Sequence, residues 1–226
     1  MSRHIFLPDA GRDARIEIPV SCFLIRHPQG NVLFDTGCHP DVARDPEARW
    51  GELSRFMVPL HGPDEHVLNG LAGLGLGPDD IDVVINSHLH CDHCGCNEFF
   101  ARATFIAHQA ELEAAAVSTS DRNGYFRKDW DHPAYDALTG QRDLFDDDRV
   151  VLIPLPGHTP GSTGALIGLD RDGEFLLASD AISVRESFDR DIAPKNTWQA
   201  EPLLASYAEA RKIESYLCKR TKKLYR

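Results

Sequence analysis

Residues 87–96, SHLHCDHCGC, hold three histidines, one aspartate and three cysteines within ten positions. Side chains this polar are costly to bury unless each one has a partner. Imidazole and carboxylate groups at such short spacing converge when they project from a strand end or a tight loop, and they suit Zn²⁺ and similar divalent ions. We therefore interpret His88, His90, Asp92 and His93 as metal ligands.

Two other interpretations of this stretch are weaker. A surface loop that is merely rich in histidine would not need four ligand-type side chains at fixed short spacing behind a buried strand. A closed structural zinc site on cysteines usually needs a second, separate cysteine pair, and we find none in the sequence. We expect the cysteines to be small, partly buried packing residues that stay thiols in a reducing cytosol. The six cysteines of the chain are Cys22, Cys38, Cys91, Cys94, Cys96 and Cys218.

The element that must position the cluster is the apolar run IDVVIN at residues 81–86, which predicts a short buried strand. The cluster therefore follows the carboxyl end of a strand, which is where open α/β sheets place their ligands. Similar patterns predict a layered α/β sandwich. The other expected elements are a hairpin with strands at 20–25 and 32–35, a helix within 63–76, a strand and helix within 103–116, a strand within 149–162, a hairpin at 163–181 and a helix at 200–219.

Composition limits the classes of function. A length of 226 residues with 42% hydrophobic content suits one sizeable domain over residues 1–226. The formal net charge of −11 argues against nucleic acid as a partner. No apolar run of about 18 residues predicts a membrane span, and the first residues lack the apolar core of a secretory signal. We expect a cytoplasmic protein without a membrane partner.

The pattern His-x-His-x-Asp-His at residues 88–93 resembles the signature of the metallo-β-lactamase superfamily. Three further segments strengthen the resemblance. LFDTG, before the motif, contains Asp35; LPGHTPGS and LLASDA, after it, contain His158 and Asp180. The resemblance implies a four-layer αββα sandwich, which we expect to be truncated at both ends. It also implies that His158 and Asp180 are ligands and that Asp35 supports the site without binding metal.

Within this superfamily the chain resembles the N-acyl homoserine lactonases, including relatives that open γ-butyrolactone. The resemblance runs from about residue 17 to the last residue. It is carried by IPVSCFLIRHPQGNVLFDTG, INSHLHCDHCGCNEFF, GYFRKDWDHP and PGHTPGS. The first four ligands and Asp180 are common to many hydrolases of the superfamily, whereas the segment GYFRKDWDHP is more specific. The implied activity is the opening of a small-molecule lactone, or of a related ester.

The resemblance also implies how the ligands are shared. His88, His90 and His158 would hold one metal ion, and Asp180 would bridge it to a second. Zn²⁺ is the expected ion, with one or two per chain, although such sites accept other divalent transition metals. Two neighbouring cations can share a hydroxide, lower its pKa towards neutrality and polarise the lactone carbonyl that it attacks.

Asp92 and His93 would contribute to the second ion, and Asp92 would also be catalytic by carrying a proton to the departing alkoxide. The family's last ligand, a histidine in a Gly-His-Asp turn, has no counterpart in this sequence. We therefore expect one tightly bound metal and weak activity. The tyrosine that meets the substrate carbonyl in the family is replaced by Ser183.

Two other functions stay open. A thioester hydrolase similar to glyoxalase II would share the bridging Asp180, and a metal-binding remnant without turnover would follow from the missing histidine. The acyl-chain preference and the formation of a homodimer are also open. Residues that resemble the substrate-covering region of the family, or that simply form an apolar face, are Trp50, Phe56, Met57 and Leu60.

Overall fold

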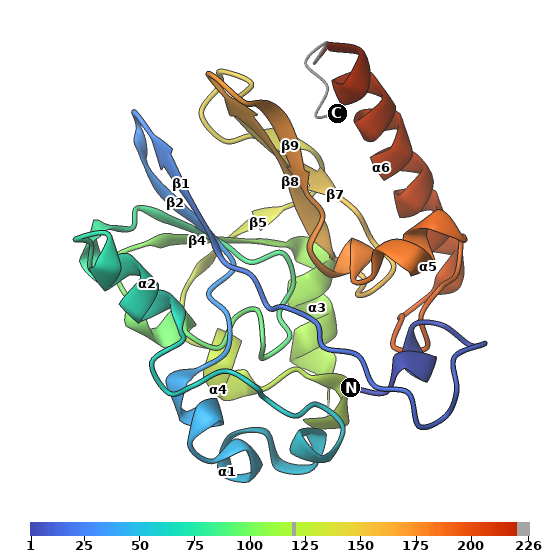
Figure 1. Ribbon diagram of the computed structural model, residues 1–226. Coiled ribbons are helices and arrows are strands. Elements are labelled where there is room, and N and C mark those ends of the chain that lie inside the picture. The colour runs from blue at the N-terminus through green and yellow to red at the C-terminus, as the bar shows by residue number, and fades with distance from the viewer. Residues whose placement is uncertain (119–120, 221–226) are drawn as a thin grey trace.

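The computed structural model describes residues 1–118 and 121–220. Within these residues the chain forms two β-sheets that face each other, with helices outside them (Figure 1). The first sheet pairs β1 (Phe23–His27), β2 (Gly30–Phe34), β3 (Val83–Ile85), β4 (Thr104–His108) and β5 (Tyr135–Leu138) in that order. The second sheet pairs β6 (Arg142–Asp143), β7 (Val150–Pro154), β8 (Thr163–Leu169) and β9 (Gly173–Leu177).

The two sheets differ in strand direction. In the first sheet β1 and β2 form an antiparallel hairpin, and the pairs from β2 to β5 are parallel. The second sheet is antiparallel throughout its described strands. The α-helices are α1 (Pro46–Trp50), α2 (Val67–Gly73), α3 (Gln109–Val117), α4 (Arg127–Trp130), α5 (Arg185–Asp189) and α6 (Ala200–Arg220). The 3₁₀ turns are Arg3–Ile5, Pro40–Ala43, Gly51–Arg55, Pro78–Asp80, Asn97–Phe99, Asp121–Asn123 and Ser179–Ile182.

The main core lies between the two sheets. Strand β2 is buried on both of its faces, because Val32 and Phe34 pack between the sheets while Leu33 faces the outer helices. This explains why the strand is a continuous apolar run rather than an alternating one. The other fully buried members of the central core are Ile85, Ile106, Leu138, Val150, Leu152, Ala165 and Ile167.

Helices cover the outer faces of both sheets, which gives the four layers αββα. Leu71 of α2 packs with outward-facing strand residues of the first sheet. On the second sheet, Leu203, Tyr207 and Ala210 form a stripe along α6 that packs with Leu176 of β9. Their spacing of four and three residues places them on one side of the helix. Figure 1 shows α2 and α6 on opposite sides of the molecule.

Most of the expected elements are confirmed, including the strand that leads into the histidine cluster and the long helix near the end of the chain. Strands β5 and β6 and the short helices α1, α4 and α5 were not expected from the sequence. The five cysteines whose side chains are described are free thiols, as predicted, and Cys218 lies outside the described side chains. None of the helices in the described ranges is long and apolar enough to cross a membrane.

Truncation of Leu152 to alanine should test the central core. Leu152 is fully buried between the sheets, whereas Leu169 at the end of β8 is 46% exposed. Leu152→Ala should lower the free energy of unfolding by about 2–5 kcal/mol because it leaves a cavity. Leu169→Ala, the same change at an exposed site, should stay within about 0.5 kcal/mol. Denaturant unfolding measures both, and equal effects at the two sites would contradict the described core.

Candidate metal centre

His88 lies three residues beyond the end of β3 and is 1% exposed. Its Nδ1 is 3.0 Å from the hydroxyl oxygen of Ser87, and that hydroxyl donates to the Asp35 carboxylate at 2.7 Å. We assign the proton of the His88 ring to Nδ1, because the single hydroxyl proton of Ser87 is used on Asp35. The Nε2 lone pair of His88 then faces the site, where it is buried without a hydrogen-bond partner in the described part of the chain.

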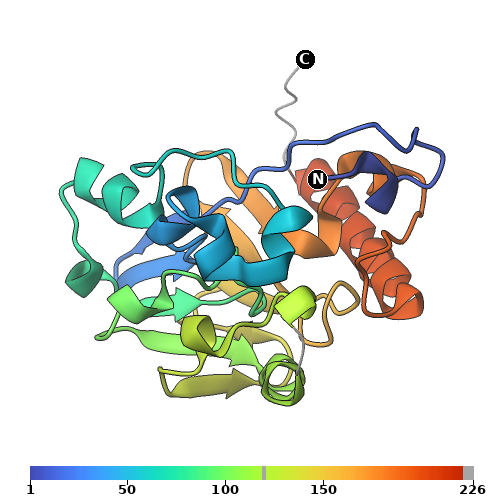
Figure 2. The same cartoon turned by 90° about the horizontal axis from the view of Figure 1, so that it is seen from below.

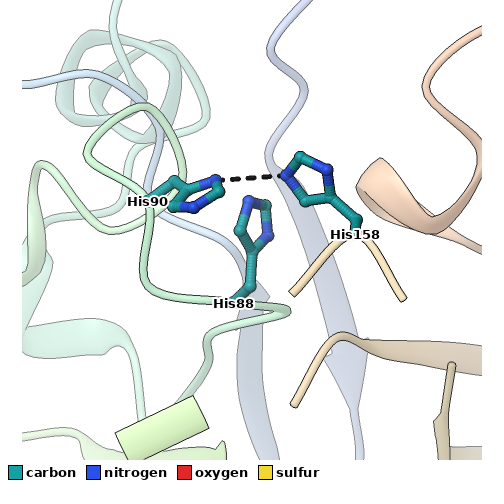
Figure 3. A group of neighbouring side chains, drawn as sticks. All are labelled: His88, His90 and His158. Atoms are coloured by element: carbon teal, nitrogen blue, oxygen red, sulfur yellow. Dashed lines mark hydrogen bonds between the residues drawn. The ribbon is translucent and has the colours of Figure 1, made fainter. Parts of the chain in front are cut away.

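His90 and His158 complete a group of three imidazoles around this nitrogen. Figure 3 shows the three rings turned toward one another from two loops, one after β3 and one after β7. His158 Nε2 is 3.1 Å from His90 Nδ1, and the candidate ligand atoms of all three residues lie within 4.8 Å of one another. Burial and the neighbouring imidazoles hold the pKa of His88 and His90 well below the usual value. Neutral imidazole is the form that binds a metal, so the group fits a divalent cation.

A second candidate group consists of His88, His93 and Asp180, whose ligand atoms also lie within 4.8 Å of one another. Asp180 lies between the two groups. One of its oxygens is 3.4 Å from His158 Nε2, and the other is 3.7 Å from His93 Nε2. A carboxylate that faces both groups can bridge two ions. The resemblance to the family implies this role for Asp180.

Carboxylates surround the His93 ring. Its Nδ1 donates to the Asp35 carboxylate at 2.8 Å, and its Nε2 faces Asp92 and Asp180, each at 3.7 Å. Burial lowers the pKa of His93, but these three carboxylates outweigh it and raise the pKa to about 10. The carboxylates around this ring favour positive charge, and the same negative environment would favour a bound metal cation.

Asp92 lies at the edge of the centre. Its side chain lines the cavity described below, and it belongs to neither of the two three-residue groups. Burial raises the pKa of Asp92, His93 opposes this rise, and the Asp180 carboxylate adds to it. A carboxyl group that lines the cavity beside the two candidate ligand groups can exchange a proton with a molecule in the cavity.

Asp35 is a buried carboxylate that accepts hydrogen bonds from Ser87 and His93. It follows β2 in a left-handed backbone conformation with φ of 60°, which aspartate tolerates better than most residues. Its carboxylate accepts the Ser87 N–H at 2.7 Å in addition to the Ser87 hydroxyl and His93 Nδ1. Asp35 thus orients residues of the site without itself being one of the grouped ligands.

The sequence did not single out Ser87 and Ser179. Their hydroxyl oxygens are 2.8 Å apart, and both lie within 3.3 Å of an Asp35 oxygen. In the sequence, these serines are marked only by their positions directly before His88 and Asp180. No characteristic spacing indicates that they lie together.

A cavity of about 1460 Å³ opens over the candidate ligands. Trp50, Met57 and Leu60 line it, as expected for a substrate-covering region, but Phe56 is 57% exposed and is not part of the lining. Ser183 also lines the cavity, where its hydroxyl donates to the backbone carbonyl of Asp180 at 3.1 Å. Its hydrogen bond is thus directed to the chain rather than into the cavity.

Comparisons with known proteins agree with this geometry. An N-acyl homoserine lactonase AttM from Azorhizobium caulinodans is 34% identical over 200 residues, which cover 84% of this chain and 75% of that protein. The AttM protein of Agrobacterium fabrum is 33% identical over 221 residues, covering 91% of this chain and 83% of that protein.

Solved structures show the same relationship. An N-acyl homoserine lactone hydrolase with N-hexanoyl-L-homoserine, its product, bound at the catalytic metal centre matches 96% of this chain and 85% of that one. Its TM-score is 0.85 at 25% identity. A family model described as the metallo-beta-lactamase superfamily matches residues 15–214. This chain therefore belongs to the metallo-beta-lactamase superfamily.

Proposed function

We propose that this protein is a metal-dependent hydrolase that opens lactone rings, with an N-acyl homoserine lactone or a similar small lactone as substrate. The observation that carries the proposal is the group His88, His90 and His158, with a buried lone pair on His88 Nε2 that no described residue satisfies. The relatives named N-acyl homoserine lactonases support the choice of substrate class.

The residues that would hold the cation follow from the two groups. His88, His90 and His158 would hold one ion, and His93 and Asp180 would serve a second, with Asp180 between them. Asp92 belongs to neither group, but its carboxylate is 3.7 Å from His93 Nε2 and would add to the second site. We propose Zn²⁺, since imidazole and carboxylate donors suit it. A divalent cation bound there would lower the pKa of water and polarise a carbonyl oxygen.

The chain itself would contribute binding, orientation and proton transfer. Trp50, Met57 and Leu60 offer an apolar wall for an acyl chain, and the cavity separates the lactone carbonyl from bulk water. Water adds to the carbonyl carbon, the ring C–O bond breaks, and the leaving oxygen takes a proton to become a hydroxyl group. We propose that the Asp92 carboxylate carries this proton, because it lines the cavity beside the ligand groups.

A cytoplasmic location is part of this proposal. The five cysteines whose side chains are described are free thiols. A reducing compartment would keep them in that state.

Hydrolysis of N-hexanoyl-L-homoserine lactone by the zinc-loaded protein tests the function. We expect ring opening that a chelator abolishes and that added Zn²⁺ restores. The reaction is monitored by the release of acid and by mass spectrometry of the product. A glutathione thioester serves as the competing substrate. If the loaded protein left the lactone intact but hydrolysed the thioester, the proposed substrate class would be wrong, and hydrolysis of neither would indicate a remnant without turnover.

We expect about one tightly held zinc ion per chain. The two donor groups share His88, which has one free ring nitrogen, so filling the first group leaves the second with fewer donors. Elemental analysis after dialysis measures the content. His158→Ala should reduce it well below one, whereas His132→Ala, at an exposed position outside both groups, should leave it unchanged. Two ions retained per chain would contradict the expectation.

Asp92→Asn should keep the first ion, because neither group in the structure requires Asp92. It should lower kcat on the order of 10²-fold or more, the size of a general acid–base contribution. Asp64→Asn provides a matched control, since Asp64 is an exposed carboxylate that also lines the cavity. Unchanged turnover in a metal-replete Asp92→Asn protein would remove Asp92 from the mechanism.

A further inference from the structure

Glu111 is a fully buried carboxylate in the first turn of α3. Its Oε1 accepts the Leu89 N–H at 3.0 Å and the Tyr125 hydroxyl at 2.9 Å, and its Oε2 accepts the Gly161 N–H at 3.1 Å. These three donors carry no formal charge. The partial positive charge at the helix N-terminus adds to their stabilisation of the carboxylate.

This side chain does not cap its own helix. His108 performs that role, because its Nδ1 accepts the Ala110 N–H at 3.2 Å. A glutamate in the first turn often reaches back to the N-cap backbone. Glu111 instead points away from α3 to donors in three other segments, so local helix formation does not account for its burial.

The donors to Glu111 belong to the segments that carry the candidate ligands. Leu89 lies between His88 and His90 in sequence, and Gly161 lies three residues after His158. A Cβ atom built on Gly161 would lie 2.4 Å from the Glu111 backbone nitrogen. The close approach of this loop to α3 therefore requires glycine.

The third donor also touches a candidate ligand. The Tyr125 ring packs edge-on against His90, with ring centroids 4.8 Å apart. Glu111 therefore reaches His90 through the Tyr125 hydroxyl and through the backbone of the adjacent Leu89.

A second connection between the two ligand loops lies on the other side of His88. The Thr163 N–H donates to the Ser87 carbonyl at 2.8 Å. The two ligand loops are thus connected on both sides of His88. At Ser87 the connection is a hydrogen bond between backbone groups, whereas at Leu89 it depends on the carboxylate side chain of Glu111.

We propose that Glu111 is a positioning residue that holds the loop of His88 and His90 against the loop of His158, and so determines how tightly the three imidazoles bind a divalent ion. The inference rests on the proposed metal centre. Glu111 touches neither the ion nor the substrate; it acts through Leu89, Tyr125 and Gly161.

Glu111→Gln separates the charge and the acceptors from the packing. Glutamine has nearly the same shape, but only one of its terminal atoms accepts hydrogen bonds and its NH₂ group only donates. With the amide oxygen toward Leu89 and Tyr125, the NH₂ group faces the Gly161 N–H. In the flipped orientation it faces the other two donors. Either way at least one buried donor loses its acceptor, and the two loops are no longer both held.

The experiment measures the Zn²⁺ dissociation constant by competition with a chromophoric chelator, using the full chain. Loss of a residue that orients metal ligands typically weakens metal affinity by about 10- to 100-fold, and we expect a rise of that size for Glu111→Gln. The ligand-field bands of the Co²⁺-substituted protein should also shift, because the geometry of the three imidazoles changes.

Asp129→Asn is the matched control. Asp129 is 1% exposed, and its carboxylate pairs with Arg49 rather than accepting a hydrogen bond from the backbone of either ligand loop. It should leave the zinc dissociation constant and the cobalt spectrum unchanged, although it alters a buried carboxylate of the same kind. A loss of affinity in Asp129→Asn equal to that in Glu111→Gln would reduce the role of Glu111 to general stability and overturn the inference.

The remaining outcomes separate this inference from the proposed function. A wild-type chain that bound neither Zn²⁺ nor Co²⁺ would overturn the metal centre and the role of Glu111 with it. A wild type that binds, together with unchanged affinity in Glu111→Gln, would overturn only the role of Glu111. If Glu111→Gln does not fold, Tyr125→Phe removes one donor and keeps the ring on His90; a smaller rise in the dissociation constant supports the inference, and no rise overturns it.

Discussion

The hydrogen bonds that Asp35 accepts from Ser87 and His93 decide the chemistry of the whole centre. Through the Ser87 hydroxyl, the carboxylate fixes the proton on His88 Nδ1, and directly it fixes the proton on His93 Nδ1. Both rings therefore present Nε2 toward the centre. Without this carboxylate the His88 ring could adopt the other tautomer, and its lone pair would point into the protein.

This arrangement depends on the sandwich. Asp35 follows β2, Ser87 follows β3, and their neighbours in the parallel sheet place both at the same edge. His158 and Asp180 come from the second sheet, after β7 and β9. The core between the sheets brings these edges together, so the packing of residues such as Phe34 and Leu152 fixes the distance between candidate ligands that are far apart in sequence. Stability and function are coupled through this packing.

The proximity of the candidate ligands could be predicted because they follow strands with clear apolar runs. Strand β3 is a continuous apolar run, and His88 lies three residues beyond its end. Strand β5 was not predicted because its sequence, YDAL, contains a charged residue and only four positions, and its neighbour in the sheet, β4, supplies the pairing. Glu111 could not be distinguished in the sequence from an ordinary polar residue of a helix, since its partners are two backbone N–H groups and the Tyr125 hydroxyl, all distant in sequence. Contacts of that kind leave no periodic pattern in the sequence.

The cavity wall depends more on apolar burial than on charge. The N-terminal segment lines the cavity with Met1, Phe6 and Ile16, and it lies beside α5 (Figure 2). Arg3 forms an ion pair with Glu186 at 2.7 Å, but both side chains are more than 40% exposed, and such pairs contribute about 0–1 kcal/mol. Phe6 and Leu7 are 1% and 2% exposed, and burial of each apolar side chain is worth about 1.5–3 kcal/mol. Burial of these two side chains therefore contributes more to the position of the N-terminal segment than the Arg3–Glu186 ion pair does.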